Sequence, residues 1–337
     1  MTDTTPPSPL PSPVPSHLRV HQFTGLQPGP RLIITGAVHG NETCGTRAIE
    51  RLLQALDSGG LRLARGVLTA IPIVNPLAYR KGQREGERNL NRNLRPAVIA
   101  QDFEDRIGRA LCPWLDAHDV LLDLHSFTAV GQAFVMLGPR NNDGPLEPFA
   151  HAAAESALAA GLGPTRIVEG WLGTYALGLQ RRALQTSDGT RRQSLNQDPH
   201  YGVGTTEYMR SRGGYGVTLE CGQHQDPNAP EVAWLAILRT LALLGMIDAA
   251  GVNLHQPTRA PELLQLYEVI DRQHAADRFA QDWVSFDAIE ADQLIGTRFD
   301  GTPVRAPEAG RIVFPNITAE PGQEWCYLAR ASQRRLI

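Results

Sequence analysis

The sequence has almost no lysine and no long hydrophobic run. Lys81 is the only lysine, so arginine carries nearly all the positive charge. The formal net charge of −3 over 337 residues excludes the strongly basic field that is typical of proteins binding nucleic acid or an anionic membrane surface. No stretch reaches the roughly 18 apolar residues of a membrane span, and no basic segment followed by an apolar one opens the chain. We therefore expect no membrane span and no signal peptide.

Cysteine is also scarce. The four cysteines are scattered, without C-x-x-C spacing, at Cys44, Cys112, Cys221 and Cys326. This usage is typical of a cytoplasmic protein whose thiols are reduced and mostly buried. Cys44 and Cys221 each lie near a candidate site residue, but a cysteine nucleophile needs a paired histidine. We therefore favour buried thiols over catalytic ones.

The composition provides enough apolar material for a sizeable core, since 42% of the residues are hydrophobic and 20% are charged. Residues 1–18 are dominated by Pro, Ser and Thr, so we expect a disordered or extended leader there. The pattern changes near residue 250. This change predicts an α/β domain over residues 19–250 and a small β-sandwich domain over residues 251–337.

Apolar runs alternate with helical patterns in the larger part of the chain. Residues 32–35, 66–74 and 120–127 have the character of buried strands, and residues 48–56 and 101–116 have the spacing of amphipathic helices. This alternation predicts an α/β fold with a mixed, mostly parallel sheet flanked by helices.

The later part of the chain has shorter elements. Residues 180–214 are polar and irregular, and we expect them to form a loop on the substrate side. Residues 215–220 have the pattern of a strand that ends in a carboxylate. Short strands separated by turns are predicted at 283–286, 302–305, 311–314 and 325–329.

Three residues have the chemistry of a metal site. His39 and Glu42 follow the first buried strand, and His125 lies near the end of another. Open α/β sheets place their ligands at such strand ends. Catalytic zinc sites use three His or carboxylate ligands and keep one position for water, whereas structural sites fill all four positions and favour Cys. The set predicts one catalytic Zn²⁺ per chain, although such ligands accept other divalent ions too.

Each of these signals has an ordinary alternative. H-x-x-E occurs often by chance, and a histidine at a strand end is commonly a hydrogen-bonded core residue; their joint occurrence favours the metal site. Asp123 shares a strand face with His125, so it either accepts a hydrogen bond from that imidazole or caps a backbone group. Glu220 alone would be a solvated strand end. Beside a metal it is a candidate for moving protons between water and a leaving amine.

The loop from Arg80 to Arg95 is long, polar and rich in arginine. Arginine binds carboxylates through two parallel hydrogen bonds, so Arg84, Arg88 and Arg92 favour a carboxylate-bearing substrate. A merely solvated loop, or one that binds phosphate or nucleic acid, is the alternative. The near-neutral net charge argues against nucleic acid.

The ordered motifs G-A-V-H-G-N-E, N-L-N-R and D-L-H-S, followed by a late strand-borne glutamate, resemble the succinylglutamate desuccinylase/aspartoacylase family. That family belongs to the zinc carboxypeptidase-like hydrolases, and the resemblance spans roughly residues 30–330. It implies the zinc carboxypeptidase-like fold. It also implies that His39, Glu42 and His125 bind zinc and that Glu220 is the general base and acid.

The resemblance also implies roles for several polar residues. Arg84 is similar in spacing to the arginine that polarises the scissile carbonyl and steadies the oxyanion. Asn91 and Arg92 resemble the pair that holds the substrate carboxylate. Arg210 is a candidate for a second carboxylate contact, and Arg212 competes with it.

The chain departs from the family pattern at Asn89, where N-L-N-R replaces the usual D-L-N-R. We expect the lost negative charge to affect how Arg92 or its neighbours are oriented. Such a change bears on substrate identity more than on hydrolysis.

Together these features predict a zinc-dependent hydrolase that cleaves the amide bond of a small, carboxylate-bearing N-acyl amino acid. In the family, a small C-terminal β domain narrows access to the site, which favours small substrates. Two alternatives stay open: a zinc carboxypeptidase acting on peptides, and a non-catalytic zinc- or ligand-binding protein. The sequence does not fix the acyl group, the amino acid or whether the chain forms a homo-oligomer.

Overall fold

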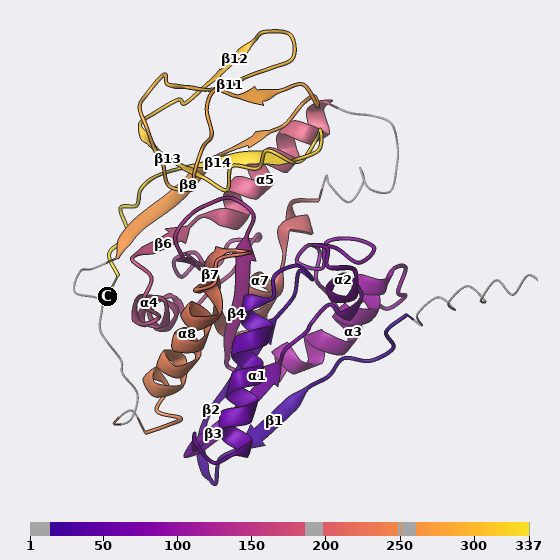
Figure 1. The fold of residues 1–337 in the computed structure, drawn as a ribbon, viewed down its shortest axis with the longest axis vertical. Helices are drawn as coiled ribbons and strands as arrows, with labels where there is room; N and C mark the ends of the chain where they lie inside the picture. Colours follow the sequence, from indigo (N-terminus) through magenta and orange to yellow (C-terminus); the bar gives the residue numbers. More distant parts are fainter. Residues whose placement is uncertain (1–13, 186–197, 249, 251–260, 337) are drawn as a thin grey trace, which may run out of the picture.

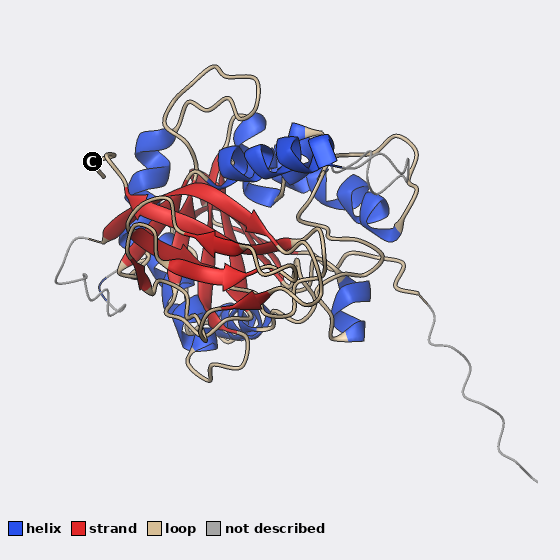
Figure 2. Cartoon of the chain, turned by 90° about the horizontal axis from the view of Figure 1, so that it is seen from above, coloured by secondary structure: helices blue, strands red, loops and turns tan. Residues whose placement is uncertain are grey.

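The computed structural model describes residues 14–185, 198–248, 250 and 261–336. The Pro-rich leader lies mostly outside these residues, and the division at residue 250 falls beside a stretch that is not described. The three domain limits therefore stay predictions. One large sheet runs through the described residues, and Figure 2 shows helices on both of its faces.

The large sheet has eleven strands and mixed pairing. In spatial order they are β1 (His21–Thr24), β3 (Arg65–Ile71), β2 (Gln27–Gly36), β4 (Val120–Phe127), β7 (Tyr215–Gln223), β5 (Phe134–Leu137), β6 (Arg166–Glu169), β8 (Glu262–Asp271), β14 (Glu324–Ala331), β13 (Gly310–Val313) and β10 (Ala288–Ile289). The central strands β3, β2, β4 and β7 are parallel neighbours. The predicted mixed, mostly parallel sheet with flanking helices is confirmed.

The helices divide between the two faces of the sheet (Figure 1). They are α1 (Cys44–Asp57), α2 (Pro76–Lys81), α3 (Phe103–Asp116), α4 (Ala152–Gly161), α5 (Trp171–Gln185), η1 (Pro199–Gly202), α7 (Thr205–Ser211) and α8 (Ala229–Leu243). Side chains alternate along β2, so Leu32 and Ile34 pack in the cluster with α1, α4 and α8, whereas Ile33 packs with α3 and α7. Among the described residues, no helix is long and apolar enough to cross a membrane.

The C-terminal strands extend the same sheet. β8 pairs in parallel with β6, and β14, β13 and β10 follow in antiparallel order. A second sheet of β12 (Pro303–Arg305), β11 (Leu294–Thr297) and β9 (Arg278–Phe279) packs nearby, drawn in orange and yellow in Figure 1. Trp325 is buried between the two sheets, with its ring 4.1 Å from that of Phe279. The small antiparallel sheet expected near the C-terminus is therefore present.

Two local predictions were wrong. Residues 283–286 do not form a strand. Phe286 has a φ of +77°, which is incompatible with an extended strand. The buried Trp283 indole donates to the Ile295 carbonyl at 3.0 Å. Residues 180–214 are not irregular throughout. Helix α5 continues to Gln185 and α7 occupies residues 205–211, while residues 186–197 lie outside the described part.

The end of the chain is bonded to residues of β6, α4 and the segment after β5. The Arg334 guanidinium donates to the carbonyl of Gly138 at 2.8 Å, to Glu169 Oε2 at 3.0 Å and to Ser156 Oγ at 2.8 Å.

All four cysteines are buried and form no disulfide, as expected.

The central strand β4 generates a stability prediction. Leu122 is fully buried between α1 and the neighbouring strands. Leu122→Ala should lower the free energy of unfolding by about 2–5 kcal/mol, measured by urea denaturation, because it leaves a cavity in a packed layer. Leu26→Ala is the matched control, since Leu26 is fully exposed and its loss should cost less than about 0.5 kcal/mol. Equal effects of the two substitutions would contradict this account of the core.

Candidate active site

The loop after β2 carries two of the predicted ligands and is held in an uncommon conformation. Ala37 has a φ of +47°, which a non-glycine residue adopts only when its surroundings impose it. The Asn75 amide donates to the Ala37 carbonyl at 3.0 Å and so fixes this turn. A Cβ at Gly40 would lie 1.9 Å from the carbonyl carbon of Ala78 in α2, so only glycine fits between His39 and Asn41.

His39, Glu42 and His125 converge at the end of the sheet. Their candidate ligand atoms all lie within 4.8 Å of one another, and all three side chains are buried. Glu42 bridges the two imidazoles, with Oε1 2.8 Å from His39 Nδ1 and Oε2 2.8 Å from His125 Nδ1. The three residues predicted as metal ligands are thus brought together.

The second nitrogen of each imidazole has its own partner. His125 Nε2 lies 2.9 Å from Asp123 Oδ2, so the hydrogen-bonding alternative for Asp123 is the observed one. Asp123 also accepts from the hydroxyls of Thr35 and Thr205. His39 Nε2 lies 3.0 Å from Asn89 Oδ1. The side chain of Asn89 therefore contacts a candidate ligand, and its Oδ1 also accepts from the backbone amide of Asn91, next to Arg92, at 2.9 Å.

The electrostatics of this cluster fit a cation. Burial opposes a charge on His125, but Asp123 and Glu42 nevertheless raise the pKa of His125 well above its usual value. Burial lowers the pKa of His39 to about 4, and Arg84 contributes, so this imidazole is neutral and can donate a lone pair. Two buried carboxylates thus attract positive charge to a point between nitrogen and oxygen donors, which is the donor set that zinc prefers.

Glu220 lies on β7 directly opposite His125 on β4. Its Oε2 atom is buried and, within the described residues, has no hydrogen-bond partner. Burial, together with the charge of Glu42, raises the pKa of Glu220 to about 8. A buried, unpaired carboxyl at a strand end is a group positioned for proton transfer. The solvated strand end considered for Glu220 does not occur.

A cavity of about 320 Å³ opens beside Glu220 and Arg84. Arg84, Asn91, Arg92, Arg210 and Glu220 are among the residues that line it. The Arg84 guanidinium is half-exposed and donates to Glu42 Oε1 at 3.0 Å. The predicted catalytic and substrate-binding side chains therefore share one cavity.

The arginine-rich loop is shaped by the first turn of α3. Glu104 accepts hydrogen bonds from the backbone amides of Gly86, Glu87 and Arg88. The Arg88 side chain pairs with Asp102 at 2.8 Å, and its role is therefore to hold the loop. These contacts present Asn91 and Arg92 to the cavity.

Arg92 lies against aromatic rings. Its guanidinium carbon is 4.9 Å from the ring centre of Trp171 and 4.8 Å from that of Tyr175, and Nη1 donates to the Asn91 carbonyl at 2.8 Å. The Asn91 side chain accepts from the Thr205 amide at 2.9 Å. Arg92 is thereby fixed in place at the cavity wall.

Arg210 and Arg212 are placed differently. Arg210 is buried and its Nε lies 2.9 Å from Glu155, while Nη1 lies 2.6 Å from Glu147. A substrate carboxylate would have to displace these partners. Arg212 pairs with Asp116 at 2.9 Å on the surface and does not belong to the cavity lining.

Several lining residues were not predicted from the sequence. Trp171 and Tyr175 have the i, i+4 spacing of one helical face, but Gly173 and Gly178 weaken the helical signal. Glu324 and Tyr327, on β14, also line the cavity. They come from the far end of the chain, and no local pattern marks them.

Comparisons with known proteins point to the family that the sequence motifs resemble. Residues 28–163 match the family model described as the succinylglutamate desuccinylase/aspartoacylase catalytic domain. A succinylglutamate desuccinylase from Pseudomonas paraeruginosa is 41% identical over 64 residues. This match covers 19% of the present chain and 19% of that protein.

Solved structures show the same fold over most of the chain. A succinylglutamate desuccinylase/aspartoacylase from Rhodobacter sphaeroides superposes with a TM-score of 0.69 at 16% identity, covering 94% of this chain and 90% of the other. The ectoine utilization protein EutE (DoeB) from Ruegeria pomeroyi, in a product-bound structure, gives a TM-score of 0.68 at 18% identity, with coverages of 93% and 88%. Residues 28–163 thus match the succinylglutamate desuccinylase/aspartoacylase catalytic domain, and most of the chain shares its fold with solved structures that carry this family's name.

Proposed function

We propose that this protein is a zinc-dependent hydrolase that cleaves the amide bond of an N-acyl amino acid. The observation that carries the proposal is the position of Glu220. Its unpaired carboxyl lies on the strand next to His125, beside the buried cluster of His39, Glu42 and His125. A proton-transfer group next to a three-ligand cation site is an arrangement suited to metal-assisted hydrolysis of an amide.

The chain's own residues supply the binding and proton-transfer steps. His39, Glu42 and His125 would hold the ion, which when bound polarises a carbonyl and lowers the pKa of water. Glu220 takes a proton from the attacking water and delivers it to the leaving nitrogen. A carboxyl whose pKa is raised towards neutrality is suited to both transfers, and burial acts on Glu220 in this direction.

Two arginines orient the substrate. Arg84 reaches the cluster and is half-exposed, so it can donate to the carbonyl oxygen as that atom gains negative charge. Arg92, fixed against Trp171 and Tyr175, presents its guanidinium to the substrate carboxylate together with Asn91. A carboxylate held at Arg92 fixes one end of the substrate and so restricts the orientation of its amide.

Replacement of the proposed general base tests the mechanism. Glu220→Gln should lower kcat by about 10²–10⁴-fold, because the isosteric amide cannot transfer a proton, while metal content stays unchanged. Glu231→Gln is the matched control, since Glu231 is exposed on α8 and pairs with Arg51. Near wild-type turnover by Glu220→Gln would refute the role assigned to this residue.

Removal of a ligand tests the metal site. His39→Ala should reduce the zinc that stays bound after dialysis to well below one ion per chain, measured by atomic emission, because two protein ligands remain of three. His200→Ala is the control, because His200 is exposed and pairs with Asp198. Full retention of zinc by His39→Ala would show that the ion is held elsewhere.

A substrate panel separates the proposal from its alternatives. Amine release should occur from an N-acyl amino acid and should stop when a chelator is added. Release from peptides with a free C-terminus and from no N-acyl amino acid would identify a carboxypeptidase. Bound metal without any turnover across both groups of compounds would favour a non-catalytic zinc- or ligand-binding protein.

A further inference from the structure

The charges around the cavity bear on which substrates it accepts. Four arginines line it: Arg84, Arg92, Arg182 and Arg210. Arg210 is surrounded by three carboxylates, with Glu155 at 2.9 Å, Glu147 at 2.6 Å and Glu207 at 3.4 Å. Since these three groups and the Gly216 carbonyl already accept hydrogen bonds from the guanidinium, it offers no free donor to a further anion.

Arg182 is neutralised in the same way. Its Nε and Nη2 lie 2.8 Å from the two carboxylate oxygens of Asp271, and Nη2 also lies 3.1 Å from Glu324. Glu324 itself lines the cavity. Although burial opposes its charge, Arg182 and Arg92 keep the pKa of Glu324 below its usual value. This carboxylate is therefore ionised and presents negative charge to the cavity.

Two arginines are left for an anionic substrate. Arg84 contacts Glu42 at the metal cluster, where it serves the scissile carbonyl. Arg92 donates to a backbone carbonyl and lies over aromatic rings; Glu324 is near enough to interact with its charge, but no ion pair joins Arg92 to a carboxylate in the described part of the chain. The cavity thus has one cationic position suited to one carboxylate.

The wall next to Glu220 is uncharged. Phe127, Met136 and Phe314 line the cavity there, and the rings of Phe127 and Phe314 are 5.9 Å apart. Met136 lies opposite Thr218 in the β5–β7 pairing, two residues before Glu220 along β7. A charged group placed against this wall would lose its hydration without gaining a partner.

We propose that the substrates are N-acyl amino acids with a single carboxylate, whose acyl group and side chain are both uncharged, and that the site rejects dicarboxylates. This inference rests on the proposed function and specifies its substrate class. The carboxylate binds at Arg92, and the uncharged part of the substrate packs against Phe127, Met136 and Phe314. Glu324 and the carboxylates around Arg210 repel a second negative group.

Pairs of substrates that differ by one carboxylate provide the test with the metal-loaded wild-type protein. N-butanoyl amino acids are compared with N-succinyl ones, N-acetyl-leucine with N-acetyl-aspartate, and N-acetyl-glutamine with N-acetyl-glutamate. The monocarboxylate of each pair should have a kcat/KM at least about 100-fold higher, because the additional carboxylate of the other member meets repulsion and no second cation. Hydrolysis of the dicarboxylates at equal or higher kcat/KM would overturn the inference and leave the proposed function standing. Absence of hydrolysis for every compound would overturn both.

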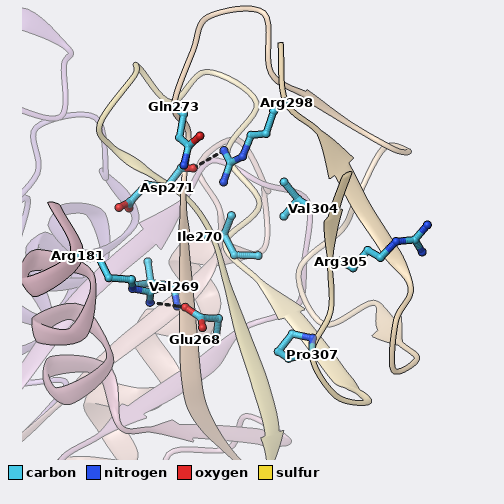
Figure 3. A pocket seen from close by; sticks show the side chains of 10 residues that line it. All are labelled: Arg181, Glu268, Val269, Ile270, Asp271, Gln273, Arg298, Val304, Arg305 and Pro307. Carbon is cyan, nitrogen blue, oxygen red and sulfur yellow. Dashed lines mark hydrogen bonds and ion pairs between the residues drawn. The ribbon is translucent and has the colours of Figure 1, made fainter. Parts of the chain in front are cut away.

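A single substitution tests the role of Glu324. Glu324→Gln keeps the size of the side chain and removes its charge, so the ratio of kcat/KM for N-succinyl over N-butanoyl substrates should rise about tenfold. Glu268→Gln is the matched control. Figure 3 shows Glu268 paired with Arg181 in a separate cavity among the C-terminal strands, so its loss should leave the ratio unchanged. Equal ratios in Glu324→Gln and the wild type, with the fold intact by circular dichroism, would show that Glu324 does not set the specificity.

Discussion

Parallel pairing of β2, β4 and β7 is the constraint on which the rest of the site depends. The three strands end at the same edge of the sheet, and their register places Thr35 opposite Asp123 and His125 opposite Glu220. A slip of one residue would turn His125 to the other face and separate it from Glu42. Because β4 is buried along its whole length, packing against helices on both faces resists such a slip. The backbone hydrogen bonds between these strands therefore determine the relative positions of the side chains in the site.

Around this edge, charge is arranged in layers. Buried carboxylates lie against the two imidazoles, and the unpaired carboxyl of Glu220 lies on the neighbouring strand. Farther out, Arg182 and Arg210 are held by acidic partners, whereas Arg92 is held by aromatic rings and a backbone carbonyl. An arginine fixed by rings keeps its charge available, whereas one fixed by carboxylates does not. The partners of each arginine, and not its residue type, therefore decide whether its charge is free to bind an anion or is used to hold the structure.

Features of the site that depend on residues close together in the sequence could be predicted, whereas contacts between distant residues could not. The central strands were predictable because their apolar runs are local, and the meeting of His39, Glu42 and His125 followed from where parallel strands end. The setting of Arg210 was not predictable, because Glu155 and Glu147 lie 55 and 63 residues away along the chain. The same holds for Glu324, which reaches the cavity through a sheet pairing between β14 and β8. The contact of Asn89 with His39 joins residues 50 apart and depends on how α3 shapes the loop between them.

The pairing of β6 with β8, together with the bonds of Arg334 to Gly138 and Glu169, has a consequence for any shortened form of the protein. A chain ending near residue 250 would retain the candidate metal ligands and Glu220, yet it would expose an unpaired strand edge along β6 and lose Tyr327 and Glu324 from the cavity wall. Such an edge is a template for strand addition from a second molecule. Truncated forms should therefore self-associate, and residues 261–336 act as a permanent cap on the sheet as well as a wall of the site.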